Sequence, residues 1–200
     1  MSFGPTGGLV EKMFFSQPDP EKIKEHPLFA EFKRRGYLPY KKALRLAMDC
    51  HVSNPYNPDK PIASDLHASV VEALHKKGVL NSLVDFDKVG YYSSLYTPLD
   101  YFHGVDGILI VETGEGKIVV SLDVTINPHK SHAKADFVIQ AGDMPDAKLE
   151  KEKYKKFIHK LAEEIADVIV YKLKDLRRKK VIPKFLPDNI ASLPEKRVNH

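Results

Sequence analysis

Cysteine is almost absent from this sequence: the one thiol, Cys50, has no partner for an internal disulfide. This favours a reducing compartment. No run approaches the ~20 consecutive apolar residues that a membrane-spanning helix needs. The first twenty residues contain glycine and proline where a signal peptide has a basic start and an apolar core. We therefore expect a cytoplasmic protein without a membrane partner.

Several kinds of site are also excluded. The histidines have no cysteine partners and no zinc-type spacing, which argues against a structural zinc. Gly114 and Gly116 are not followed by the Lys-Ser/Thr pair of a phosphate-binding loop, and no Gly-x-Ser-x-Gly elbow is present. The formal net charge of +4 is too small to imply a nucleic-acid partner by itself.

The 200 residues, 42% of them hydrophobic, are sufficient for one domain with a sizeable core. Residues 1–18 are interpreted as an N-terminal arm, whose apolar segment 9–15 docks on the core or on a neighbour and so offers a route to a homo-oligomer. Residues 19–180 are expected to form a single domain that begins with helices, and residues 181–200 an irregular C-terminal tail.

Capping residues and hydrophobic spacing place the helices. Asp19 and Pro20 begin a helix that Pro27 interrupts and Gly36 ends. Ser64 is expected to cap a further helix, which Gly78 terminates. The helix that Ser64 caps is expected to span residues 65–77. Further helices are expected at 39–52 and 149–176, and strands at 79–86, 89–95 and 135–140.

The end of the last helix is strongly basic, and we weigh a phosphate-binding patch there against stabilisation of the helix dipole. The residues concerned are Lys172, Lys174, Arg177, Arg178, Lys179 and Lys180.

The centre of the chain predicts a hairpin with two unusual aspartates. Asp106 stands just before the apolar run 108–111, and Asp123 interrupts the apolar run 118–124. The segment 113–116, Thr-Gly-Glu-Gly, has the composition of a hairpin turn. Since neighbouring strands lie only ~5 Å apart, the two carboxylates can converge on one metal ion.

A third acid, Glu72, lies off the buried stripe of its helix, a position also typical of an ordinary solvated carboxylate. Glu72, Asp106 and Asp123 together supply the hard oxygen ligands that Mg²⁺ or Mn²⁺ prefers. Such a metal activates water and polarises a phosphoryl oxygen, and a nearby lysine stabilises the charge that develops.

The helix glutamate, the strand start Gly104-Val105-Asp106-Gly107, the hairpin and Asp123 resemble the core of the PD-(D/E)XK, or restriction-endonuclease-like, nuclease superfamily. The resemblance spans roughly residues 64–176. It implies an α/β (α+β) fold with a central mixed sheet flanked by helices, here with an N-terminal helical extension. It also implies a lysine at position 125, where this sequence has Thr125.

Two lysines are candidates to replace the missing one, Lys130 and Lys134, and His129 and His132 lie in the same segment as further phosphate contacts. The sequence therefore leaves two functions open. The first is a metal-dependent nuclease that hydrolyses DNA phosphodiesters, with the DNA backbone along the basic end of the last helix. The alternative is a non-catalytic nucleic-acid-binding or assembly protein on a nuclease-like fold, of phage or mobile-element origin and acting in the host cytoplasm.

A third interpretation is that the acids are surface residues of an unrelated protein. It fails if the carboxylates of Asp106 and Asp123 lie within reach of one shared ion in the fold, and a lysine that also points there favours the nuclease over the non-catalytic alternative.

Overall fold

The computed structural model describes residues 7–82, 85–130 and 134–181. Its centre is a mixed sheet with the strand order β1-β2-β3-β4. The strands are β1 (Val89–Ser93), β2 (Gly107–Thr113), β3 (Gly116–Thr125) and β4 (Phe137–Gln140). The pairs β1–β2 and β2–β3 are antiparallel, and β3–β4 is parallel. The predicted α+β class, with a central mixed sheet between helices, is therefore confirmed.

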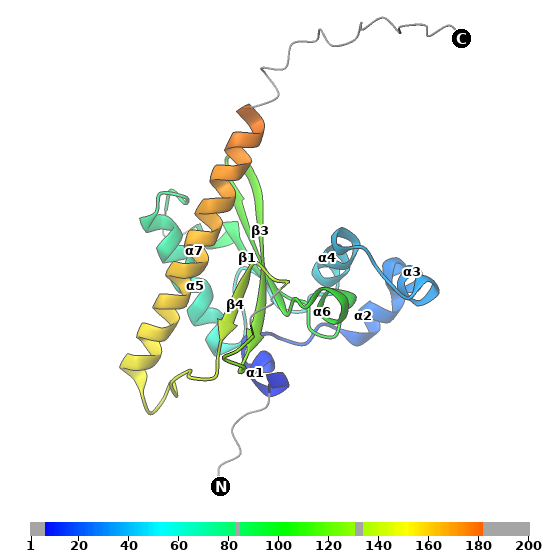
Figure 1. Ribbon diagram of the computed structural model, residues 1–200, viewed down its shortest axis with the longest axis horizontal. Coiled ribbons are helices and arrows are strands. Elements are labelled where there is room, and N and C mark those ends of the chain that lie inside the picture. The colour runs from blue at the N-terminus through cyan, green and yellow to red at the C-terminus, as the bar shows by residue number, and fades with distance from the viewer. Residues whose placement is uncertain (1–6, 83–84, 131–133, 182–200) are drawn as a thin grey trace, which may run out of the picture.

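Helices cover both faces of this sheet (Figure 1). On one side α5 (Pro61–Lys76) and α7 (Lys151–Val181) pack against each other. The other side carries α4 (Tyr40–Asp49) and α6 (Pro98–His103), with α2 (Pro20–Glu25) and α3 (Pro27–Arg35) beyond them. Because side chains alternate along a strand, Leu109 faces the α5–α7 side whereas Ile108 faces the α4–α6 side.

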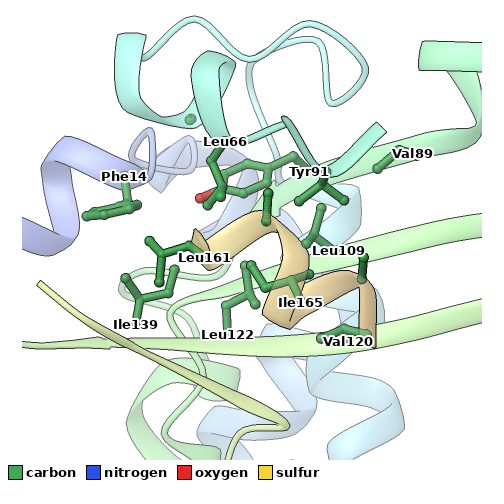
Figure 2. Close-up of a cluster of buried hydrophobic side chains, with 14 of the residues drawn as sticks. Phe14, Leu66, Val89, Tyr91, Leu109, Val120, Leu122, Ile139, Leu161 and Ile165 are labelled. Atoms are coloured by element: carbon green, nitrogen blue, oxygen red, sulfur yellow. The ribbon is translucent and has the colours of Figure 1, made fainter. Parts of the chain in front are cut away.

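The larger of the two cores lies between the sheet and α5–α7. Figure 2 shows Leu66 of α5 and Ile165 of α7 gathered with Leu109 and Leu122 from the sheet. Leu66, Val70 and Leu74 are all buried, which confirms the stripe expected for this helix. Packing of this kind, not intrinsic propensity, supplies most of the stability of a helix in a folded protein.

The first helices follow the sequence signals closely. The carboxylate of Asp19 accepts hydrogen bonds from the backbone N–H groups of Glu21 and Lys22, so it caps α2 as predicted. Gly36 ends α3 with a φ of 70°, which is the left-handed conformation that glycine adopts without strain. The start of α5 was wrong by one turn, because Pro61 takes the first helical position and Ser64 already lies inside the helix.

The strand expected at residues 79–86 is also wrong over the part that the structure describes. The N–H groups of Val79 and Leu80 both bond back to the carbonyl of Leu74, so the chain folds over the end of α5. A 3₁₀ helix, η1 (Asp85–Lys88), follows, and residues 83–84 lie outside the described residues. The structure also contains α6, which the sequence analysis did not anticipate.

The segment interpreted as an arm contains a helix, α1 (Gly7–Phe14), that packs on the chain's own core. Val10, Phe14 and Phe15 are buried, while Leu9 and Met13 remain exposed. Of the tail, residues 182–200 lie outside the described residues. In the described part of the chain, no helix has the length and apolar character required to cross a membrane.

Candidate active site

The backbone holds Asp106 in place on three sides. Its N–H donates to the carbonyl of Leu122 at 2.8 Å, and its own carbonyl accepts from the N–H of Ser94 at 2.9 Å. Its carboxylate accepts a 2.7 Å hydrogen bond from the N–H of Val124. The residue is only 6% exposed. Asp106 is therefore a fixed acid at the point where β1, β2 and β3 meet.

Asp123 lies beside it at the end of the same strand pair. Gly107 pairs with Leu122 in the antiparallel ladder. Asp106, just before Gly107, and Asp123, just after Leu122, therefore stand opposite each other at the next position. Neighbouring strands are about 4.8 Å apart, which places the two residues next to each other. Asp123 is buried, and its carboxylate lies 2.5 Å from Nζ of Lys130. Both acids are buried, so they are not the surface residues that the third interpretation requires.

Thr125 helps to bring Lys130 to this position. Its hydroxyl accepts a 3.1 Å hydrogen bond from the N–H of Asn127, whose side-chain oxygen in turn accepts from the N–H of His129. The N–H of Lys130 then donates to the carbonyl of Asn127. These local bonds turn the chain back after β3, as Asn and Thr side chains commonly do in turns. Thr125, at the position where the resemblance implies a lysine, thus shapes the loop that places Lys130 beside Asp123.

Two further acids surround the pair, and neither was expected. Burial, followed by the charges of Asp100 and Asp123, raises the pKa of Glu11 on α1, while Lys130 opposes the rise. Burial also raises the pKa of Asp100 on α6, whose carboxylate accepts a 2.8 Å hydrogen bond from the N–H of Tyr96. Elements from the start and the middle of the chain therefore contribute acids to one place, at the end of the sheet where α1 lies (Figure 1).

The effect is greatest at Asp106, whose pKa is raised to about 7. Burial is the main cause, and the negative charges of Glu11, Asp123 and Asp100 add to it. The bond from Val124 acts in the opposite direction but does not cancel the rise. At neutral pH this carboxyl is thus poised between its two forms, a property often found in catalytic acids and bases.

The structure does not bring Glu72 to this cluster, which corrects the predicted ligand set. The Glu72 carboxylate is half exposed on α5 and forms a 2.6 Å ion pair with Lys76. That pair lowers the pKa of Glu72, and His159 of α7 contributes. Glu72 is an ordinary solvated helix carboxylate, and Glu11 is the helix acid near the aspartates.

The two candidate lysines are also separated. Lys130 reaches Asp123, whereas Nζ of Lys134 donates to the carbonyl of Phe102 on α6 at 3.1 Å. His129 is exposed just before Lys130, and His132 lies outside the described residues. Of the two candidate lysines, Lys130 is therefore the one whose ammonium lies beside an aspartate of the pair.

The basic residues of α7 lie at the other end of the sheet, over the β2–β3 turn. Arg177 and Lys180 form ion pairs with Glu115 in that turn. Lys172 bonds to the carbonyl of Val119 and pairs with Asp136 at 2.7 Å. Lys179 pairs with Asp175 one helical turn before it. Lys172, Arg177 and Lys180 therefore fasten α7 to the sheet, whereas Lys179 pairs within the helix.

The donor set at the acids fits a hard divalent cation only in part. Asp106 and Asp123 offer carboxylate oxygens, and Mg²⁺ commonly keeps several waters while binding one or two carboxylates. Their mutual repulsion is the kind of strain that a cation relieves. Across residues 7–82, 85–130 and 134–181, however, no three Asp, Glu, His or Cys side chains converge closely enough to hold an ion. Two adjacent carboxylates are therefore the most that this part of the described chain offers an ion.

Sequence reasoning missed Glu11, Asp100 and Tyr96. One signal for Asp100 was present: Thr97-Pro98 is a typical helix start, and Thr97 does cap α6 through the N–H of Leu99. Glu11 had no comparable signal, because its neighbourhood depends on how α1 packs on β3.

Comparison of the chain with family models, with curated proteins and with solved structures returned no match in any of the three.

Proposed function

We propose that this protein is a metal-dependent nuclease that hydrolyses DNA phosphodiester bonds, on a restriction-endonuclease-like core. One observation carries the proposal: two buried aspartates flank the same rung of β2–β3, and a lysine from the following loop reaches one of them at 2.5 Å. The element order supports it in part, since α5 precedes the sheet and α7 follows it, although β4 comes before α7 and not after it.

Asp106 and Asp123 are the residues that would hold Mg²⁺ or Mn²⁺, with Glu11 close enough to act on them through its charge. When bound, the ion would activate a water molecule and polarise the phosphoryl oxygen. Lys130 places a positive charge beside Asp123, where it can stabilise the negative charge that grows on the phosphate. Without the ion, burial and the neighbouring acids raise the pKa of Asp106 to about 7, and binding of the ion would favour its ionised form.

The first test is cleavage of plasmid and single-stranded DNA with Mn²⁺ and with Mg²⁺, comparing the wild type with four variants. Asp123→Asn is expected to abolish cutting and to leave DNA binding intact. Lys130→Met should slow cutting about 100-fold, the usual cost of losing one group that stabilises transition-state charge. Lys134→Met is the matched control from the same loop and should cut normally.

Glu72→Gln, the fourth variant, separates the structure from the sequence-based expectation. Because its carboxylate is exposed and paired with Lys76, it should cut at the wild-type rate. Undiminished cutting by Asp123→Asn would refute the proposal. A wild type that binds DNA but cuts with neither ion would favour the non-catalytic alternative, for which the Lys130–Asp123 pair is a charge-neutralising structural contact.

A further inference from the structure

Next to the acids, the surface is hollowed into a groove of about 590 Å³, and half of its lining residues are aromatic. We call it the aromatic groove and define it by Phe29, Phe32, Tyr96, Tyr101 and Phe102. The rings come from α3, from α6 and from the segment just before α6. Large exposed aromatic surface of this kind is unusual on a folded protein and generally marks a binding site.

The rings divide into a floor and a rim. Phe29 and Phe32 pack on each other, and Phe32 meets Phe102 edge-on with ring centres 5.5 Å apart. The tyrosines are more open: Tyr101 is 64% exposed and Tyr96 is 44% exposed. The phenylalanines therefore hold one another in place, while the two tyrosines present ring surface to a ligand.

Tyr96 links the groove to the acidic cluster. Its φ of 62° makes it the one described non-glycine residue in the left-handed region, a strained conformation that tends to persist at functional sites. The conformation is held by the hydrogen bond from its N–H to the carboxylate of Asp100. The charge of Asp100 in turn acts on Asp106. The rim of the groove and the proposed reaction centre are thus joined through one side chain.

The charges around the groove are suited to a polyanion. Nζ of Lys12 lies 5.7 Å from the centre of the Tyr96 ring, and Lys24, which pairs with Glu21 at 2.8 Å, lines the groove. On the far wall, Nζ of Lys33 lies 5.0 Å from the Phe29 ring. Aromatic faces for planar groups, interspersed with lysines for a phosphate backbone, form the combination that binds unpaired nucleic acid.

We infer that the aromatic groove binds single-stranded DNA, with unpaired bases on Tyr96 and Tyr101, beside the acids that act on its backbone. This inference rests on the proposed function and specifies its substrate. A duplex conceals the faces of its bases, so the exposed rings give it no equivalent contact. The substrate is therefore an unpaired strand, or a junction or end that contains one.

The experiment is fluorescence anisotropy with a labelled oligothymidylate of about 12 nucleotides, in EDTA so that nothing is cut. Tyr101→Ala should weaken binding about tenfold, as expected for the loss of one stacked base, whereas Tyr101→Phe should bind normally. Tyr96→Gly removes the second ring and suits the left-handed backbone, and it should also weaken binding. Tyr171→Ala is the control, since this tyrosine is 72% exposed on α7, away from the groove.

The same variants are then assayed for cutting of single strands and of a duplex with Mn²⁺. A higher KM for the single strand with a nearly unchanged kcat supports the inference. If the duplex binds more tightly than the single strand, or if Tyr101→Ala binds as the wild type does, the inference is overturned while the proposed function can still stand. If Tyr101→Ala loses binding but no ion supports cutting in the wild type, the nuclease proposal fails and the groove remains a binding site.

Discussion

Among the individual residues, Asp106 lies in surroundings that disfavour the ionised form of its carboxyl group. Three other acids act on it, and burial removes the water that would stabilise a carboxylate. A buried carboxyl of this kind makes the fold less stable than a neutral side chain would, a cost commonly found at functional sites.

We predict that Asp106→Asn stabilises the protein while it abolishes cutting. The carboxyl pKa is 3.8 in the unfolded chain and about 7 in the folded one. Between these values the folded protein keeps a proton that the unfolded chain has lost, so stability falls as the pH rises from about 4 to 7. The variant avoids this cost, and its free energy of unfolding should exceed that of the wild type by about 2–4 kcal/mol at pH 8.

Urea unfolding at a series of pH values measures this difference. The gain should shrink toward zero below about pH 3, where both states of the wild type are protonated at this position. A gain that is the same at every pH would show that burial of the charge is not its cause.

Among the elements, α1 depends on the absence of a side chain in β2. A Cβ placed on Gly107 would lie 1.9 Å from Cε1 of Phe15, so the ring occupies the space that any larger residue needs. The Phe15 ring also stacks on Tyr91 with ring centres 5.2 Å apart. Since Gly107 directly follows Asp106, the segment that contains Glu11 and Phe15 packs against the start of β2.

Gly107→Ala is expected to destabilise the protein by about 1–3 kcal/mol, the usual cost of overpacking a core. It should also lower DNA cutting, because α1 must move and Glu11 moves with it. Thermal unfolding and the cleavage assay measure the two effects. Gly114→Ala is the matched control: no atom lies within 4 Å of its added Cβ, and its stability should change by less than about 0.5 kcal/mol.

The double variant Gly107→Ala, Phe15→Leu tests the cause. A smaller side chain at position 15 should recover part of both losses. Losses that simply add would indicate that the two positions do not interact, contrary to the packing seen here.

These elements also show which parts of the fold were accessible from sequence. The β2–β3 hairpin was predictable, because apolar runs and a glycine-containing turn are local signals that bring Asp106 and Asp123 together. The strand predicted at residues 79–86 was wrong. Val79 and Leu80 are apolar enough for a strand, but their N–H groups cap the end of α5. Glu11 and Asp100 were missed and Glu72 was wrongly chosen, because helix placement over a sheet depends on contacts far apart in the chain.

Over the molecule as a whole, the two ends of the sheet carry opposite charges. The acids lie where β2 begins, and the basic end of α7 lies over the turn where β2 stops. Seven residues separate these points, or roughly 23 Å at about 3.3 Å per residue. Within the described chain, Lys174 and Arg178 have no ion-pair partner, so they are the cations of this end that remain for a ligand.

We therefore predict that Lys174→Gln together with Arg178→Gln weakens binding of long DNA but not of short DNA. A strand of about 30 nucleotides can reach from the acids to α7, whereas one of about 4 nucleotides cannot. For the long strand, the slope of log affinity against log salt should fall by about 1–2, as expected when two phosphate contacts are lost. Equal weakening for both lengths would place these cations near the reaction centre instead.

The position of Glu11 on α1 has a consequence for the newly made chain. Glu11 leaves the ribosome long before Asp123 and Lys130 are synthesised, and α1 packs on β3, the strand that carries Asp123. A growing chain therefore holds its acids apart until the sheet is complete, and loop closure over such a separation is slow. On the proposed function, the polypeptide is harmless to nucleic acid throughout most of its synthesis and acquires its cutting centre only as the last layers of the fold close.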